Sequence, residues 1–247
     1  MPVHEIEVDC VLFDMDGTLI DSTPAVNQTW REFAEQYNLD LPYVMERCHG
    51  YRTVENLKRF IPSITDEELP ERVRAFEGRI AEIAAQAAEK GGPGRIVALP
   101  GTKKLLAEIS SASLANPSIR PGWAIVTSAT AAYGHVGFAA SLSSPSPPRT
   151  FITSDQVSRG KPAPDPYLLG AKQSGADPKR CLVVEDAPPG VLAGKAAGCR
   201  VLGLKTTHDV GRMWEAGADY VCQDLSGVSA RWEGEKLFIT IQGEEKQ

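Results

Sequence analysis

The chain has 247 residues, 42% hydrophobic and 23% charged, and its 26 basic and 32 acidic side chains give a formal net charge of −6. This composition argues against disorder, and the acidic excess disfavours a nucleic-acid partner or an anionic membrane surface. The apolar runs are shorter than the ~18 residues of a membrane span, and the N-terminal segment is acidic rather than signal-like. We therefore expect a cytoplasmic protein with no membrane partner. We also expect a monomer, because no exposed apolar stripe stands out in the sequence.

The first predicted elements are strands. Short apolar, β-branched runs alternate with helical stretches, which is typical of a parallel sheet covered by helices on both faces. The length allows one α/β domain or a domain with an insertion. The pattern predicts a doubly wound, Rossmann-like α/β fold with strands at 8–13, 123–126, 150–153, 181–184 and 201–204, and a weaker one at 219–222. A further strand at 236–241 is possible from its pattern, before a charged end that we expect to fray.

The block between the first two strands differs in composition and contains no convincing strand. Thr65 and Glu68 form a capping-box pattern, after which apolar residues recur at helical spacing. The glycine-rich segment 91–94 then ends the helix and is flexible enough to act as a hinge. We interpret 22–94 as an inserted helical cap, and 1–21 with 95–247 as the core.

Two acidic residues follow the first strand, Asp14 and Asp16, before the turn at Gly17. Ligands bind at such strand ends in open α/β sheets. Two carboxylates this close repel each other unless a cation or a shared proton lies between them, and Mg²⁺ prefers oxygen ligands. On its own the pattern is also compatible with an ordinary Asp-Gly turn or a calcium loop.

Later strands end in polar residues too. Thr127 and Ser128 follow the second strand, where each could also be a plain helix cap. Lys161 lies in a rigid Gly-Lys-Pro segment before a helix for which Asp165 is the predicted N-cap. Another strand ends in an acidic pair, which could instead cap the next helix: Glu185 and Asp186.

Taken in order, these four groups resemble the motifs of the haloacid dehalogenase superfamily: D-x-D-G-T, a strand-ending Thr or Ser, a Lys and an acidic pair. The resemblance covers nearly the whole chain. Four sequence segments are similar to segments of the fungal glycerol-1/3-phosphatase and 2-deoxyglucose-6-phosphate phosphatase group: CHGYRT, WAIVTSAT, GKPAPDPYLLGA and VVEDAPPGVLAGKAAGC. This similarity implies a phosphomonoesterase for a small phosphorylated sugar or polyol.

The resemblance also implies roles. Asp14 would be the nucleophile that forms an aspartyl-phosphate, and Asp16 the general acid and base. Thr127 would bind the phosphoryl group, with Ser128 as the reserve choice, and Lys161 would bridge that group and Asp14. An acid at position 16 makes C–halogen and C–P cleavage unlikely chemistries for this chain.

Metal and substrate roles follow from the same resemblance. Mg²⁺ would be held by Asp14, the backbone carbonyl of Asp16 and Asp186, with Glu185 as a ligand or as support for one. The cap loop offers the candidate substrate-binding residues His49, Gly50, Tyr51 and Arg52.

Two alternative functions share these motifs. A phosphomutase of the β-phosphoglucomutase type would return the phosphoryl group to the sugar, whereas a non-catalytic relative would only bind phosphorylated metabolites. A nucleophile together with an acid argues against the pure binder.

Five cysteines are spread along the chain without a C-x-x-C pair, so we expect neither disulfides nor a zinc site.

Overall fold

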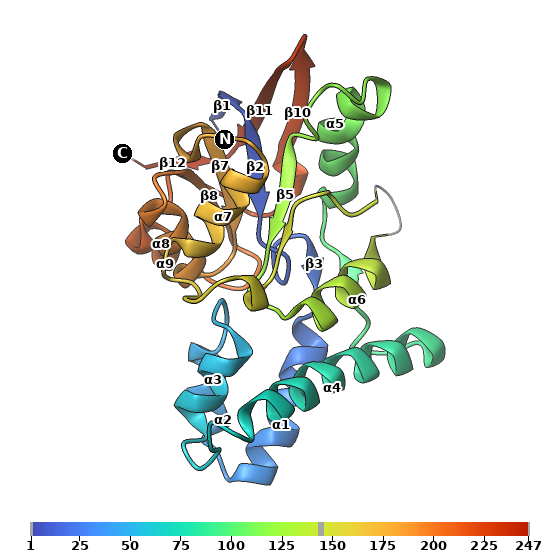
Figure 1. The fold of residues 1–247 in the computed structure, drawn as a ribbon, viewed down its shortest axis with the longest axis vertical. Coiled ribbons are helices and arrows are strands. Elements are labelled where there is room, and N and C mark those ends of the chain that lie inside the picture. Colours follow the sequence, from blue (N-terminus) through green and yellow to red (C-terminus); the bar gives the residue numbers. More distant parts are fainter. Residues whose placement is uncertain (1, 143–145, 247) are drawn as a thin grey trace.

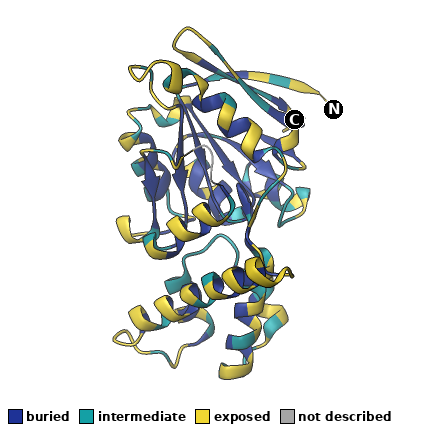
Figure 2. Cartoon of the chain, turned by 90° about the vertical axis from the view of Figure 1, so that its right-hand side faces the viewer, coloured by how far each residue is buried: buried dark blue, intermediate teal, exposed yellow. Residues whose placement is uncertain are grey.

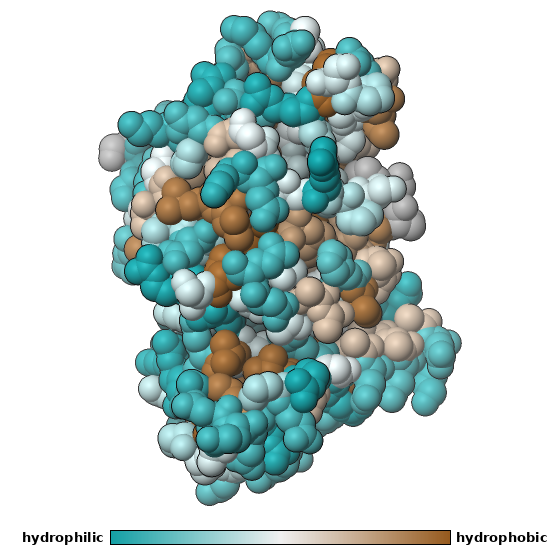
Figure 3. Space-filling view, in the orientation of Figure 1, coloured by the Kyte–Doolittle hydropathy of each residue, from teal (hydrophilic) through white to brown (hydrophobic). Residues whose placement is uncertain are grey.

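A computed structural model describes residues 2–142 and 146–246. It consists of a sheet-centred core with a group of helices below one edge of the sheet (Figure 1). No helix in the described ranges is long and apolar enough to cross a membrane. On the face seen in Figure 3, hydrophilic residues cover most of the surface.

The central sheet has seven strands in the order β12-β9-β8-β7-β2-β5-β6. All neighbours pair in parallel except β12, which pairs with β9 in the antiparallel sense. Chain order reverses around β2, which creates a topological switch point at its carboxyl end. The strands are β2 (Cys10–Phe13), β5 (Trp123–Val126), β6 (Phe151–Ile152), β7 (Cys181–Glu185), β8 (Arg200–Leu204), β9 (Tyr220–Cys222) and β12 (Glu244–Glu245).

Helices cover both faces of this sheet. Successive side chains of β2 point to opposite faces, so Leu12 packs in one apolar cluster and Phe13 in the other. The first cluster includes residues of α7 (Asp165–Gln173), α8 (Pro188–Ala196) and α9 (Val210–Ala216), and the second includes residues of α5 (Thr102–Ala115) and α6 (Ala131–Ser141). The strands are buried between these layers (Figure 2), and the predicted doubly wound fold is confirmed. Short 3₁₀ turns lie at Ser154–Gln156, Pro178–Arg180 and Leu225–Gly227.

The helical group contains α1 (Thr23–Tyr37), α2 (Leu41–Arg47), α3 (Thr53–Phe60) and α4 (Leu69–Lys90). Aromatic rings form its centre: the Phe76 centroid lies 4.5 Å from that of Trp30 and 4.9 Å from that of Phe33. Short strands β3 (Ile20–Asp21) and β4 (Val97–Ala98) pair where the chain enters and leaves this group. On that pairing we propose residues 22–94 as the cap.

Two helix starts differ from the sequence expectation. Thr65 and Glu68 do exchange reciprocal hydrogen bonds, but they form a turn, and α4 begins at Leu69. Asp165 is the first residue of α7, whose N-cap is Pro164, and the Asp165 carboxylate accepts hydrogen bonds from Arg159.

A second, antiparallel sheet lies at the end of the core farthest from the cap (Figure 1). It has the order β1-β11-β10, formed by β1 (Val3–Val8), β10 (Val228–Glu233) and β11 (Lys236–Gln242).

The expected strand at 8–13 is therefore wrong in extent, since Asp9 separates β1 from β2. The strand at 236–241 is confirmed, and the fraying expected after it is wrong for Glu244–Glu245, which pair with β9. The sequence also predicts a polar, proline-rich loop at 141–148; its first residue, Ser141, is the last residue of α6, and residues 143–145 lie outside the described ranges.

Candidate active site

The carboxyl ends of β2, β5 and β7 meet at the edge of the sheet that faces the cap. A cavity of about 100 Å³ lies there, between core and cap. Most of the predicted site residues line it: Asp14, Asp16, Thr127, Ser128, Asp186, His49, Gly50 and Tyr51. Lys161 and Glu185 lie beside Asp14 as a buried pair, and Arg52 is the one predicted residue that points elsewhere.

The centre of the site is an ion cluster. The Lys161 Nζ atom lies 2.5 Å from Asp14 Oδ1 and 2.7 Å from Glu185 Oε1, and the lysine side chain is 1% exposed. Burial alone would lower the pKa of Lys161, but the Asp14 and Glu185 carboxylates outweigh it and raise that pKa. Lys161 therefore stays charged and holds Asp14 in place.

Each carboxylate oxygen of Glu185 accepts two hydrogen bonds. Its Oε1 accepts from Lys161 and from the Tyr167 hydroxyl at 2.8 Å, and its Oε2 accepts the backbone N–H groups of Asp186 and Ala187 at 3.0 and 3.1 Å. Of the two roles expected for Glu185, support of the cluster suits these contacts better than direct metal ligation.

The carboxylates at this edge fit a divalent cation. Asp14, Glu185 and Asp186 each offer an oxygen within 4.8 Å of the others, and all three are buried. Their combined charge exceeds that of Lys161, and burial together with the charge of Glu185 raises the pKa of Asp186 to about 7. A buried, under-neutralised set of oxygen ligands is the environment that Mg²⁺ occupies in proteins.

Asp186 also approaches the backbone of the turn after β2. Its Oδ1 accepts a hydrogen bond of 2.9 Å from Thr18, and Thr207 donates to its Oδ2. Gly17 has a φ of +86°, and a Cβ at this position would lie 2.3 Å from Asp186 Oδ2. Only glycine allows the turn to pass so close to the carboxylate.

Asp16 has a different environment from Asp14. Its Oδ1 accepts hydrogen bonds from the Ser22 hydroxyl at 2.6 Å and from the Tyr133 hydroxyl at 2.9 Å. Burial raises the pKa of Asp16, although both donors lower it. Neither of these donors contacts Oδ2, and a carboxyl group with a raised pKa can exchange a proton there.

The cap loop contacts the core at the two polar residues that follow β5, Thr127 and Ser128. The Ser128 hydroxyl donates to the Gly50 carbonyl at 2.9 Å, whereas Thr127 Oγ1 accepts from the Ala129 amide at 3.1 Å and lines the cavity. Burial, followed by the nearby His208, lowers the pKa of His49 to about 4. His49 is therefore uncharged at neutral pH.

Arg52 joins the cap to the core outside this cavity. Its Nε and Nη2 bind Glu55 Oε1 at 2.9 and 2.6 Å, while Nη1 and Nη2 donate to the carbonyls of Val157 and Ser158 at 3.2 and 3.3 Å. Its guanidinium is thus held by the core loop that precedes Lys161.

Several side chains of the site were not predicted from the sequence, namely Thr18, Ser22, Glu77, Tyr133, Tyr167 and Thr207. A usable signal existed for Glu77, because an acid interrupts the apolar stripe of α4. The others carry no such signal, since hydroxyl residues are common near helix starts.

Comparison with known proteins agrees with this site. The family model of haloacid dehalogenase-like hydrolases matches residues 8–198. The chain is 36% identical to hexitol phosphatase A of Escherichia coli over 88% of its length and 92% of that protein. It is 34% identical to glycerol-1-phosphate phosphohydrolase 2 of Saccharomyces cerevisiae over 90% and 85% of the two chains. It is 32% identical to the yeast 2-deoxyglucose-6-phosphate phosphatase 1 over 91% of each. The resemblance expected from the motifs is confirmed, and the chain belongs to the haloacid dehalogenase-like hydrolase family.

Proposed function

We propose that this hydrolase is a Mg²⁺-dependent phosphomonoesterase that cleaves small sugar or polyol phosphates through an aspartyl-phosphate. The observation that carries the proposal is the pairing of two unlike aspartates in one cavity, Asp14 held by Lys161 and Asp16 held by Ser22 and Tyr133. The named activities of the relatives on hexitol, glycerol and deoxyglucose phosphates support the substrate class.

In the first step an Asp14 carboxylate oxygen attacks phosphorus, and the bond from phosphorus to the ester oxygen breaks. Asp16 gives its proton to that leaving oxygen, which releases the alcohol. In the second step Asp16 takes a proton from a water molecule that attacks phosphorus, which frees inorganic phosphate and restores Asp14. The raised pKa of Asp16 suits both transfers.

Other residues stabilise the transferring group. Thr127 lines the cavity beside Asp14, and we assign it the phosphate-binding role because the Ser128 hydroxyl is engaged with Gly50. Lys161 lies on Asp14 Oδ1, from which it can neutralise charge on the phosphoryl oxygens.

Asp14, Asp186 and the backbone carbonyl of Asp16 would hold the Mg²⁺, with Glu185 fixing Lys161 beside them. The ion supplies charge neutralisation between the carboxylates and the phosphate.

The cap would exclude water and shape the leaving-group end of the cavity. We propose His49, Gly50 and Tyr51 as its substrate-facing loop and Arg52 as a positioning residue that holds the loop against the core. The five described cysteines are free and buried, which suits the reducing cytoplasm where we place the enzyme.

The test is release of inorganic phosphate, with Mg²⁺, from glucitol 6-phosphate, glycerol 3-phosphate, 2-deoxyglucose 6-phosphate and glucose 1-phosphate. We expect release from at least one polyol or sugar phosphate, and none from the Asp14→Asn variant. A phosphomutase would isomerise glucose 1-phosphate with almost no free phosphate, and a pure binder would neither isomerise nor release.

A further inference from the structure

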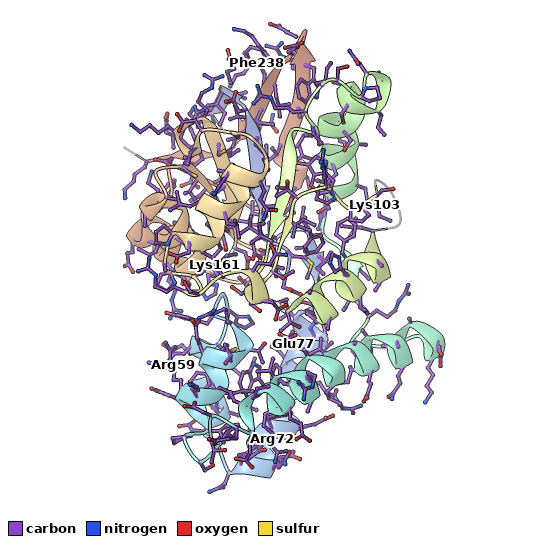
Figure 4. All side chains as sticks on the ribbon, viewed as in Figure 1. Arg59, Arg72, Glu77, Lys103, Lys161 and Phe238 are labelled. Carbon is purple, nitrogen blue, oxygen red and sulfur yellow. The ribbon has the colours of Figure 1, made fainter. Side chains whose placement is uncertain are left out.

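The cap contributes one buried acid to the cavity, Glu77 in the middle of α4. It is 4% exposed, and its side chain lies on the helix face turned toward the core (Figure 4). Its Oε1 accepts hydrogen bonds from the Thr53 hydroxyl at 2.8 Å and from the Thr130 amide at 3.3 Å, and the Thr130 hydroxyl donates to its Oε2. Because Thr53 is in the cap and Thr130 precedes α6 of the core, the carboxylate is fixed in position from both sides.

The charges around the cavity are unevenly distributed. Its acidic lining residues are Asp14, Asp16, Asp186 and Glu77, and among the described residues that line it there is no lysine or arginine. Lys161 and the proposed Mg²⁺ neutralise the phosphate end. Glu77 also lines a neighbouring cavity with Arg52 and Arg74, but in the described part of the chain no basic side chain forms an ion pair with it. His49, which lines the active-site cavity too, is uncharged at neutral pH.

From this distribution we propose that Glu77 is a specificity-determining residue: it restricts the enzyme to phosphate esters with an uncharged, hydroxyl-bearing leaving group and rejects those with a second anionic group. The inference rests on the proposed phosphatase function and narrows its substrate class.

Two physical effects support this selectivity. A second carboxylate or phosphate in the leaving group would be desolvated beside a fixed negative charge, with no cation to pair with. Hydroxyl groups, in contrast, can donate hydrogen bonds to carboxylate oxygens. The same charge also disfavours a sugar bisphosphate, the species that a hexose phosphomutase would have to retain.

Two substrate pairs isolate the charge. Glycerol 3-phosphate and 3-phosphoglycerate of matched configuration at C2 differ only in having a terminal alcohol or a carboxylate, as do glucitol 6-phosphate and 6-phosphogluconate. For each pair, kcat/KM is measured with Mg²⁺ at pH 8, because burial raises the pKa of Glu77 and a higher pH favours its carboxylate form. We expect the wild type to prefer the alcohol member by about 100-fold, the order of effect that like charges give in a partly desolvated site.

Glu77→Gln keeps the size of the side chain and removes its charge, so we expect the ratio within each pair to fall by about 10-fold or more. Effects of the variant on cap closure act on both members and cancel in the ratio. Glu71→Gln is the matched control, an exposed acid of the same helix, and should leave the ratio unchanged.

Equal kcat/KM for the two members in the wild type would overturn the inference, whether or not the variant folds. So would a folded Glu77→Gln enzyme with the wild-type ratio. Release of phosphate from none of the four esters would instead contradict the proposed function.

Discussion

Replacing Lys161 with methionine removes the positive charge from the buried cluster and keeps the length of the side chain. Asp14 and Glu185, at 2.5 and 2.7 Å from Nζ, then lie close together without a cation, and both carboxylates are largely buried. Breaking a buried ion pair by removal of one partner costs about 3–5 kcal/mol, a large part of the ~5–15 kcal/mol by which a domain is stable.

The assay is urea unfolding followed by circular dichroism, at neutral pH without added Mg²⁺. We expect Lys161→Met to lose about 3–5 kcal/mol, and Lys161→Met/Glu185→Gln to lose about 1–3 kcal/mol less than the sum of the single variants. Lys103→Met is the control, because Lys103 is an exposed lysine of α5 (Figure 4) and should change stability by less than about 0.5 kcal/mol. A loss below about 1 kcal/mol at Lys161, or strictly additive effects, would refute the reasoning.

Four further predictions concern other parts of the site. Gly190→Ala should lower kcat about 10-fold or more, because a Cβ there would lie 1.6 Å from Glu185 Oε1 and displace it; wild-type turnover would contradict this. Millimolar Mg²⁺ should raise the melting temperature of the wild type by about 3–6 °C but not that of Asp186→Asn, and equal shifts would remove Asp186 from the ligand set. Arg52→Ala should raise KM for all accepted esters alike, since it ties the cap to the core; a change in substrate preference would return Arg52 to the pocket. His49 has a folded pKa of about 4 against an ordinary 6.5, so stability should fall as pH drops from 6.5 toward 4, and His49→Gln should remove about 2 kcal/mol of that loss; identical pH profiles of unfolding would contradict its burial.

The six parallel strands of the central sheet could be predicted because their sequences are largely apolar, as burial on both faces requires, whereas the exposed, charged β12 could not. The second sheet was harder to see. Glu5–Val8 alternates polar and apolar residues, the pattern of a half-exposed antiparallel strand, but β1 continues almost directly into β2. The break falls at Asp9, whose carboxylate binds Arg180 at 2.9 Å, and that contact joins segments 171 residues apart. Such a partner is invisible in the local sequence.

The core of the site was predictable for a topological reason: parallel strands bring their carboxyl ends to one edge, so the residues after each strand must meet. The cap carries no equivalent constraint. Whether Arg52 or Glu77 faces the cavity depends on the rotation of α3 and α4 and on how the cap sits against the 157–158 loop. In the structure Glu77 lines the pocket, whereas the Arg52 guanidinium binds the 157–158 loop outside it.

The claim that Asp14 becomes phosphorylated is central to this account and can be measured directly. Enzyme turning over glucitol 6-phosphate, or the best ester of the panel, is quenched in acid, reduced with borohydride and mapped by peptide mass spectrometry. We predict a reduced aspartyl residue at position 14 alone, absent when substrate is omitted and in Asp14→Asn. Steady release of phosphate with Asp14 unmodified, or with the modification on another residue, would contradict it.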